Sequence, residues 1–394
     1  MKTVGIISEY DPFHNGHKYQ TDVLRGMGAD AIVSVLGGSF SQRGNTHICD
    51  KYLRAEAAVL SGGPDLVLEL PYPFSCSGAT YFAKAGVHIA ASACDSLAFG
   101  CEEREPQILI ELAHFLSDGR FDKLMSDKRA CDCISSTPRL TEEIIRSELS
   151  EKHVIALQKP NNILAVEYLR AIYDGNYDLE PIFIERKGTY HNSDIVCNNV
   201  ASASHIRELI ASNGYWRDYC PKECFDLLNK AKSNGDVPCD ISFASSAVLY
   251  KLRSLDPEKV DGFAECGGGL GRRIVKYASE ARSMTELYNA LNTKRYTNAR
   301  IRRAVISCLL ETTEECVASL PEFTSLLAAN EKGLSLLRAC KMPVLSTPSD
   351  IRRLDATELS ELYIDAERFI SLCYEKTKQE YDLFTRKPAI IVNK

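Results

Sequence analysis

The chain has 394 residues, of which 45% are hydrophobic and 25% are charged, and its formal net charge is -6. This length predicts two or three domains with a sizeable core, and the composition is that of an ordinary globular protein. The net negative charge excludes a polycation, so any binding of nucleic acid requires a local basic patch. The sequence has no apolar run as long as a membrane span, and its first residues become polar too early for a signal peptide. We therefore expect a cytoplasmic protein.

The fifteen cysteines are scattered along the chain, mostly among apolar neighbours. Only Cys131 and Cys133 stand close together, and their spacing differs from that of a zinc knuckle. Without an export signal, such cysteines are expected to be reduced thiols in core and surface positions. The sequence therefore predicts no structural metal site.

The first half of the chain alternates short apolar runs with longer helical patterns. Runs bounded by Gly, Asp or Pro predict strands at 3–8, 30–36, 65–70 and 95–100, and a fifth strand is expected within 180–192. Strands that alternate with helices in this way predict an α/β fold with a Rossmann-like, doubly wound parallel sheet. Ligands of such sheets bind beyond the carboxyl ends of the strands, so the polar strand exits are the place to look for a site.

The exit of the first strand, SEYDPFHNGHKY, contains two histidines three positions apart. Pro12 restricts the turn, and Gly16 lets the backbone approach a ligand closely. His17 falls in the first turn of the next helix, whose free N–H groups and positive dipole favour a phosphate. Here the imidazoles of His14 and His17 can donate hydrogen bonds to phosphate oxygens, which suits nucleotidyl transfer. A solvated histidine pair and a zinc-binding His-x-x-His are the alternatives.

The segment 200–209 predicts a second helix N-terminus suited to phosphate. Ser202 or Ser204 can cap this helix, and Arg207 projects from its first turn. An ordinary capped amphipathic helix is the plainer alternative.

The second half of the chain differs in composition from the first. All eight histidines lie at or before His205. Apolar spacing from about 220 to 390 predicts helices throughout, with 386–394 as a short strand or a tail. We therefore expect a catalytic domain over 1–215 and a mainly α-helical domain over 216–394.

Basic residues concentrate in this second half. The stretch 292–305 has five basic residues and no acidic one, with a tyrosine among them. Such patches contact phosphates, and a tyrosine can stack on an unpaired base. A solvated helix face is the alternative. The residues predicted to bind RNA are Arg272, Arg273, Lys294, Arg295, Tyr296, Arg300, Arg302 and Arg303.

The pattern Pro-x-His-x-Gly-His after the first strand resembles the HxGH nucleotidyltransferase superfamily. Because SFSQRG, DLVLELP, KPNNILAVEYLRAI, ASASHIREL and NTKRYTNARIRRA follow in this order, the chain resembles the bacterial tRNA(Met) cytidine acetate ligase family from residue 2 to at least residue 310. It departs from the family pattern in three places. Asp11 stands where the family usually has Asn, and the segment after Gly44 lacks the expected acidic residue and proline. Ser204 and His205 replace Thr-Ser.

This resemblance implies an ATP-dependent ligase that activates acetate as acetyl-AMP. It would then acetylate the wobble cytidine of elongator tRNA(Met) to N4-acetylcytidine, and Mg2+ would accompany the ATP. The alternatives are an adenylyltransferase or acetate ligase acting on a small cofactor or carrier protein, and a non-catalytic nucleotide-sensing or RNA-binding module. The sequence leaves open the oligomeric state, the acetate site and the group that accepts the cytosine proton.

The resemblance also implies roles for particular residues. His14 and His17 would hold the phosphates and stabilise charge at the α-phosphorus. Gly100 would admit the adenosine, and one of Asn161 and Asn162 would contact ATP. The expected ATP-binding residues are Ile7, Ser8, Glu9, Tyr10, Asp11, Pro12, Phe13, His14, Asn15, Gly16, His17, Lys18, Tyr19, Gln20, Gly100, Asn161, Asn162, Arg186, Ser202, Ser204 and Arg207.

The exit of the second strand and the helix after it carry a further polar and basic group. These residues could meet tRNA or phosphates, or they could form a solvated basic face. They are Gln42, Arg43, Lys51 and Arg54.

Overall fold

The computed structural model describes residues 1–131, 137–185, 199–293, 295–379 and 385–392. Two of the predicted site residues, Arg186 and Lys294, lie outside the described residues.

The described strands form one sheet in the order β5-β4-β1-β2-β3-β6-β7, with β8 paired to β6. The strands β1 to β5 run parallel to one another. The order reverses at β1, which lies between β4 and β2, and this reversal is the topological switch point. The predicted Rossmann-like parallel sheet is thereby confirmed. The strands are β1 Thr3–Ser8, β2 Ala31–Gly37, β3 Leu66–Leu70, β4 Ser96–Cys101, β5 Glu180–Glu185, β6 Thr324–Asn330, β7 Val344–Leu345 and β8 Ala389–Ile391.

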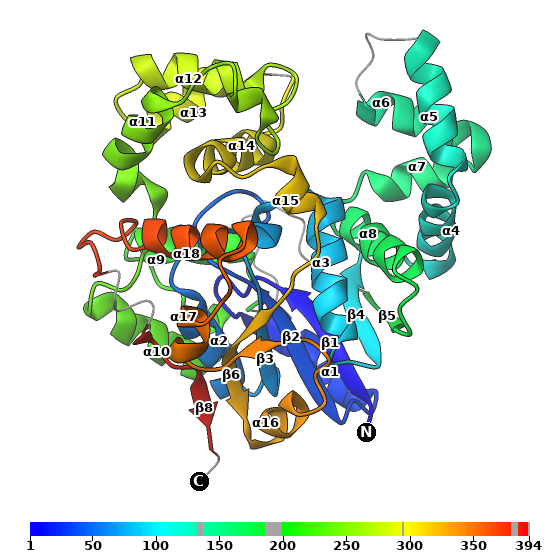
Figure 1. The fold of residues 1–394 in the computed structure, drawn as a ribbon. Helices are drawn as coiled ribbons and strands as arrows, with labels where there is room; N and C mark the ends of the chain where they lie inside the picture. Colours follow the sequence, from blue (N-terminus) through cyan, green and yellow to red (C-terminus); the bar gives the residue numbers. More distant parts are fainter. Residues whose placement is uncertain (132–136, 186–198, 294, 380–384, 393–394) are drawn as a thin grey trace.

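Helices cover both faces of this sheet (Figure 1). On one face α3, α4 and α8 share a core with Val33 and Val35 of β2. On the other face α1 packs near Ile32, and α2, α9 and α10 pack near Leu36 and Val67. Because both faces are covered, the strands are apolar at almost every position.

The helix bounds follow the chain from the first crossover to the C-terminal region. The α-helices are α1 Asn15–Gly26, α2 Lys51–Leu60, α3 Ala79–Ala91, α4 Pro106–Ser117, α5 Arg120–Cys131, α6 Thr137–Glu148, α7 Glu151–Leu157, α8 Pro160–Asp174, α9 Ala203–Ala211, α10 Lys222–Ser233, α11 Ser245–Ser254, α12 Leu270–Glu280, α13 Met284–Leu291, α14 Asn298–Leu310, α15 Glu314–Ala318, α16 Glu331–Leu337, α17 Pro348–Arg352 and α18 Glu358–Ile370. The short 3-10 helices are η1 Phe74–Cys76, η2 Arg217–Tyr219, η3 Ile241–Ala244 and η4 Val260–Gly262.

Strand β6 corrects the prediction that residues 220–390 are helical throughout. It runs antiparallel to β3, with Ala329 opposite Leu66. The run TSLLAAN is short and almost fully buried, and periodicity does not distinguish such a run from a buried helix. The C-terminal segment forms the short strand β8 beside β6, which is one of its two expected outcomes. The sheet thus takes strands from both halves, and a domain boundary at 215/216 remains a proposal.

The helices α11 to α14 lie beyond the carboxyl ends of the central strands, at the top of Figure 1. They share a core with α18 and with Phe40 and Tyr72, which follow β2 and β3. Gly44, in the loop after β2, touches α14 directly. Its φ is +75°, and a Cβ on it would lie 2.5 Å from the backbone nitrogen of Arg303. The loop after β2 is therefore packed tightly against the helical half.

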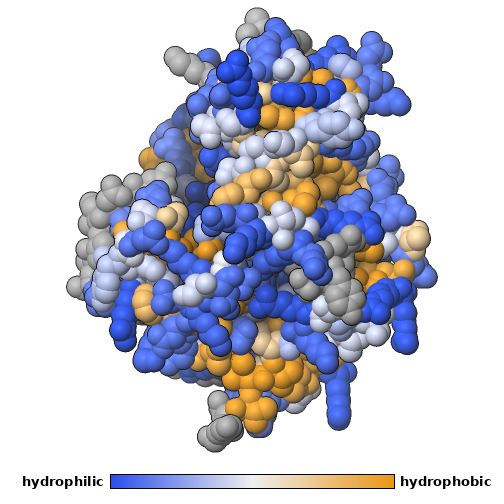
Figure 2. Space-filling view, turned by 90° about the vertical axis from the view of Figure 1, so that its left-hand side faces the viewer, coloured by the Kyte–Doolittle hydropathy of each residue, from blue (hydrophilic) through white to orange (hydrophobic). Residues whose placement is uncertain are grey.

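The surface is polar over much of the face in Figure 2, and hydrophobic side chains gather in two places, across its upper middle and at its lower end. The C-terminal strand β8 lies at this end of the molecule (Figure 1), where Ile390 and Val392 are 43% and 58% exposed. None of the helices in the described ranges is long and apolar enough to cross a membrane.

Candidate nucleotide site

The two histidines after β1 cap the helix that they begin. His14 is the N-cap of α1, and its Nδ1 accepts a hydrogen bond from the Gly16 N–H at 3.0 Å. His17 lies in the first turn, as predicted, and its Nδ1 accepts a hydrogen bond from the His14 N–H at 3.3 Å. Because both Nδ1 atoms are acceptors, each neutral imidazole carries its proton on Nε2. The pair therefore has two Nε2–H groups with which to donate.

Packing fixes the orientation of these two rings. The ring centroids of His14 and His17 are 3.8 Å apart, and the ring planes are 23° from parallel. Tyr10 and Phe13 pack on His17 at centroid distances of 4.9 and 5.7 Å. Gly16 lies beneath His14, where a Cβ would come within 2.9 Å of the ring's Cε1. In the structure the missing side chain of Gly16 makes room for the His14 ring, and its predicted close approach to a ligand stays a prediction.

The N-terminus of α9 lies beside that of α1, so the two segments predicted to bind phosphate come together. Ser202 is the N-cap of α9, and its Oγ accepts from the His205 N–H at 3.2 Å and lies 3.0 Å from the Ser204 Oγ. Arg207, the fifth residue of α9 and so just past its first turn, donates from Nη1 to the carbonyl oxygen of Asp11 at 2.9 Å. Two helix N-termini, two imidazoles and one guanidinium therefore share one edge of the sheet.

Asp11, which departs from the family pattern, is buried behind this edge. Its Oδ1 accepts from the Ile48 N–H at 2.8 Å. Its Oδ2 lies 3.3 Å from Arg207 Nη1 and 3.3 Å from His47 Nδ1. Burial raises the pKa of Asp11, but the groups around it outweigh burial and hold the pKa well below its ordinary value of 3.8. The carboxylate is therefore ionised where it contacts Arg207.

His47 is a site neighbour that sequence reasoning missed. Its side chain is 1% exposed, and within the described part of the chain neither ring nitrogen makes an aligned hydrogen bond. Burial lowers the pKa of His47 below 6.5, and the charge of Arg54 lowers it further, while Asp11 and Glu9 oppose this shift. The imidazole is therefore neutral at pH 7. The available signal was its place in the segment after Gly44, which breaks the family pattern.

Two residues predicted to face tRNA, phosphates or solvent are instead buried. Arg54 is 1% exposed and donates to four backbone carbonyl oxygens at the exits of β1 and β2 and the start of α2. Lys51 is 2% exposed, and its Nζ lies 2.7 Å from Glu69 and 3.1 Å from Glu367. The prediction is wrong for both residues, because each cation satisfies buried acceptors. Arg43, in contrast, is exposed.

The two asparagines at the start of α8 differ in their surroundings. Asn162 is fully buried; its Oδ1 accepts from the Glu102 N–H at 2.8 Å, and its Nδ2 donates to the Ala156 carbonyl at 3.0 Å. Asn161 is half-buried and donates to the Glu102 carboxylate. Gly100, near the end of β4, is half-buried. The two asparagines therefore differ in exposure: Asn162 is closed off from any ligand by burial, whereas Asn161 is accessible to one.

Other residues of the predicted stretch 7–20 have partners at the same edge. The Glu9 carboxylate accepts from the Gln42 N–H at 2.8 Å and so joins the exits of β1 and β2. Asn15 donates from Nδ2 to the carbonyl of Asn199 at 2.9 Å, which joins α1 to the segment before α9. Lys18 pairs with an aspartate one turn along α1, on the solvent side of that helix.

Basic residues of the second half line a cavity of about 470 Å³ beside α12. Arg273 and Arg295 lie over the rings of Tyr277 and Tyr296, at 4.6 and 5.3 Å from the ring centroids. Arg272 is 65% exposed at the mouth. The lining residues are Gly268, Gly269, Arg272, Arg273, Lys276, Tyr277, Thr293, Arg295 and Tyr296. Cations beside aromatic faces suit a nucleotide, because they can contact its phosphate and its base.

Two other arginines predicted to bind RNA hold the turn before α12 against α14. Arg303 is 8% exposed, and its Nε donates to Glu265 at 2.7 Å. Arg300 donates from Nη2 to the carbonyl of Gly267 at 3.0 Å. These guanidinium groups contact the protein itself, so an RNA-binding surface would depend chiefly on the residues around the cavity.

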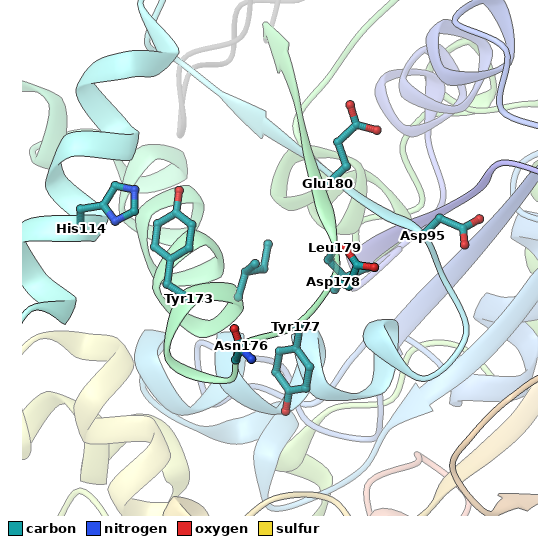
Figure 3. Close-up of a pocket in the computed structure, with 9 residues that line it drawn as sticks. Asp95, His114, Tyr173, Asn176, Tyr177, Asp178, Leu179 and Glu180 are labelled. Carbon is teal, nitrogen blue, oxygen red and sulfur yellow. The ribbon is translucent and has the colours of Figure 1, made fainter.

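A separate cavity of about 450 Å³ lies at the amino ends of the strands, near the start of β5 (Figure 3). Its walls include His114 and Tyr173, whose rings are stacked at a centroid distance of 4.2 Å. The carboxylates of Asp95, Asp178 and Glu180 also line it. The histidine turn lies at the carboxyl ends of the strands, so the two sites are separate.

A histidine-capped helix at the switch point of a doubly wound sheet, facing a second helix that carries an arginine, defines a nucleotidyl transferase of the HIGH type. The model of the HIGH Nucleotidyl Transferase family matches residues 1–383. A tRNA(Met) cytidine acetate ligase of Acetivibrio thermocellus is 31% identical over 95% of this chain and 96% of its own length. One of Halalkalibacterium halodurans is 33% identical, over 89% of this chain and 88% of its own length.

Solved structures agree with these relatives. The structure of Thermotoga maritima TmcAL without ligand superposes with a TM-score of 0.91 at 25% identity, over all of both chains. The same protein bound with alpha-thio ATP superposes with a TM-score of 0.88 at 26% identity, again over all of both chains. The chain therefore belongs to the tRNA(Met) cytidine acetate ligase family of HIGH nucleotidyl transferases.

Proposed function

We propose that this protein is an ATP-dependent ligase that activates acetate as acetyl-AMP and acetylates the wobble cytidine of elongator tRNA(Met) to N4-acetylcytidine. The observation that carries the proposal is the stacked His14–His17 pair beside Arg207, in a chain that matches ligases of this name over nearly its whole length. An acetate ligase for a small cofactor or carrier protein would have no use for the basic cavity beside α12.

In the first step an acetate oxygen attacks the α-phosphorus of ATP. A new P–O bond forms, the bond from the α-phosphorus to the bridging oxygen breaks, and pyrophosphate leaves. Charge grows on the α-phosphate oxygens and on the leaving group during this step. The Nε2–H groups of His14 and His17 would donate to those oxygens, and their fixed positions remove the need to reorganise as charge develops.

The triphosphate would lie across the N-termini of α1 and α9, with Arg207 at its β and γ end. Among the described residues no three His, Cys, Asp or Glu side chains lie together so as to hold a metal ion. Mg2+ would therefore enter as part of the substrate, held by the phosphate oxygens.

In the second step the exocyclic amine of cytosine attacks the acetyl carbonyl of acetyl-AMP. A C–N bond forms, AMP leaves and the amine loses one proton. The cytosine amine is a weak nucleophile because its lone pair is delocalised, so the good leaving group of the mixed anhydride is needed. The basic cavity beside α12 would bind tRNA in the cytoplasm through phosphate contacts. Tyr296 is buried beneath Arg295 and Arg300, so the predicted stacking of a base on this ring does not fit the structure.

The activation step is tested by acetate-dependent exchange of labelled pyrophosphate into ATP. We expect exchange with the wild type and a loss of roughly 100- to 1000-fold in His17→Ala, which removes one preorganised donor. His88→Ala is the matched control, because His88 lies on α3 and contacts Tyr177, away from the histidine turn. Exchange that is absent in the wild type, or unchanged in His17→Ala, would contradict the proposed activation chemistry.

A further inference from the structure

The Arg207 guanidinium has two possible anionic partners: Asp11, which it contacts in this structure, and the phosphates of ATP in the proposed function. Its Nη1 is bound to Asp11, through the carbonyl oxygen at 2.9 Å and through the carboxylate at 3.3 Å. The proposed function needs the charge of the same guanidinium for the phosphates of ATP. The Asp11 carboxylate neutralises part of this charge and repels the phosphates themselves.

We propose that His47 takes up a proton when ATP binds and then replaces Arg207 as the counter-charge of Asp11. This inference rests on the proposed function only in placing the phosphates of ATP at Arg207. It makes His47 a positioning residue that acts through Asp11 and Arg207.

The geometry suits His47 to this role. Its Nδ1 lies 3.3 Å from the same carboxylate oxygen that contacts Arg207. Neither ring nitrogen makes a well-aligned hydrogen bond among the described residues, although the side chain is only 1% exposed. A protonated ring at 3.3 Å would attract the ionised Asp11 carboxylate as Arg207 does, so it can replace the arginine as counter-charge. The proton comes from solvent, and no covalent bond between heavy atoms changes.

Charged groups from several elements face this pair. Glu9 and Asp11 come from the exit of β1, Arg54 from α2 and Arg207 from α9. The N–H groups of Arg54 are occupied by backbone carbonyl oxygens, and Glu9 is engaged by the Gln42 N–H. Arg207 is thus the charged partner of Asp11 whose surroundings change when ATP binds. Burial and, after it, the charge of Arg54 oppose protonation of His47, so the ring is neutral before ATP arrives. It gains its proton only when the phosphates engage Arg207.

Proton uptake on binding implies that ATP binds more tightly at lower pH. The sign follows from linkage, because the ATP-bound protein holds more protons than the free protein. ATP affinity should depend on pH in the range between two pKa values of His47: the lowered pKa in the free protein and the higher pKa in the ATP complex. Across this window the logarithm of the ATP Kd should rise by up to about one unit per pH unit more than in a protein without His47.

Calorimetry of MgATP binding to the full chain measures this directly. Titrations at one pH in buffers of different ionisation enthalpy give the number of protons taken up per ATP. We expect the wild type to take up as much as about one proton more than His47→Asn. Asp11→Asn should lose the same uptake, because an amide needs no counter-charge. His88→Ala, which changes a distant histidine, should match the wild type and thereby correct for protons taken up by ATP itself.

The affinities provide a second readout that a merely structural histidine would not produce. His47→Asn should weaken ATP binding, while Asp11→Asn with His47→Asn should restore it and remove the extra pH dependence. Equal proton uptake in the wild type and His47→Asn would overturn the inference while leaving ATP binding, and thus the proposed function, intact. If His47→Asn does not fold, NMR titration of the imidazole nitrogens in the wild type decides, since an unchanged His47 pKa with ATP bound refutes the coupling.

Discussion

Lys51 lies at the centre of a buried cluster of charged side chains. Its ammonium is the one cation in direct contact with two buried carboxylates in the described structure, at 2.7 Å from Glu69 and 3.1 Å from Glu367. The hydroxyl of Tyr363 lies 2.9 Å from the same nitrogen. Glu367 belongs to α18 and Glu69 to β3, so the cluster joins the second half of the chain to the sheet.

Lys51→Met keeps most of the side-chain volume and removes the charge. Removal of one partner from a buried ion pair costs about 3–5 kcal/mol, because the remaining charge is left without compensation. We therefore expect the free energy of unfolding to fall by about this amount. Urea unfolding followed through Trp216, the chain's single tryptophan, provides the assay. This side chain is buried near α2 and reports on that part of the core.

The loss of stability in Lys51→Met should also depend on pH. Burial raises the pKa of Glu69, and Lys51 opposes this shift, so Lys51→Met leaves the pKa higher still. A carboxyl group with a raised pKa in the folded state has its full cost in stability above that raised pKa. The cost shrinks as the pH falls through the folded pKa and is gone below the unfolded pKa. The deficit of Lys51→Met should therefore shrink as the pH is lowered. Glu367→Gln in the same chain should recover part of the loss. A deficit below about 1 kcal/mol, or one that is equal at all pH values, would refute the cluster's role.

Two further predictions concern the two proposed steps. Gly16→Ala should abolish acetyl-AMP formation in a folded protein, because the new Cβ would lie 2.9 Å from the His14 ring. Gly26→Ala on the same helix is the control: its Cβ would meet nothing within 4 Å, so this change should be tolerated. Arg272→Ala with Lys276→Ala should leave acetyl-AMP formation intact and weaken tRNA binding, with the salt dependence of log K falling by about 2 in slope if each residue contacts one phosphate.

The controls separate local from general effects. Circular dichroism of Gly16→Ala should match the wild type, and activity at the wild-type level would show that the His14 ring is not held as described. For the RNA variants, Arg120→Ala with Lys123→Ala removes two positive charges from α5, far along the chain from the cavity. An equal loss of tRNA affinity in this pair would show that net charge, and not the cavity, controls binding.

The sequence predicted the parallel sheet and the histidine turn because both rest on local signals. Apolar runs at regular intervals indicate strands, and a proline, a glycine and two histidines after the first strand indicate a capped turn. The sequence also indicated a capped helix N-terminus at 200–209, and the structure places it beside this turn, since Arg207 contacts Asp11. This juxtaposition could not be read from local signals, because the two residues are 196 positions apart.

The features that the sequence did not predict depend on contacts between residues far apart in the chain. The strand β6 pairs with β3 across more than 250 residues, and its short buried run carries no period that identifies it. Lys51 and Arg54 look like surface cations in the sequence, since charged residues are rarely fully buried unless paired. Their partners are distant carboxylates and backbone carbonyl oxygens, which only the folded chain brings together. His47 was missed for the same reason.

The central claim is tested most directly by incubating the purified protein with ATP, carbon-labelled acetate and unmodified elongator tRNA(Met). Digestion of the RNA and mass spectrometry of its nucleosides then report the fate of the label. We predict labelled N4-acetylcytidine from the wobble position, and none from a tRNA in which that cytidine is replaced by uridine. Label that remains in acetyl-AMP while the tRNA stays unmodified would contradict the proposed acceptor, and the absence of both products would contradict the ligase itself.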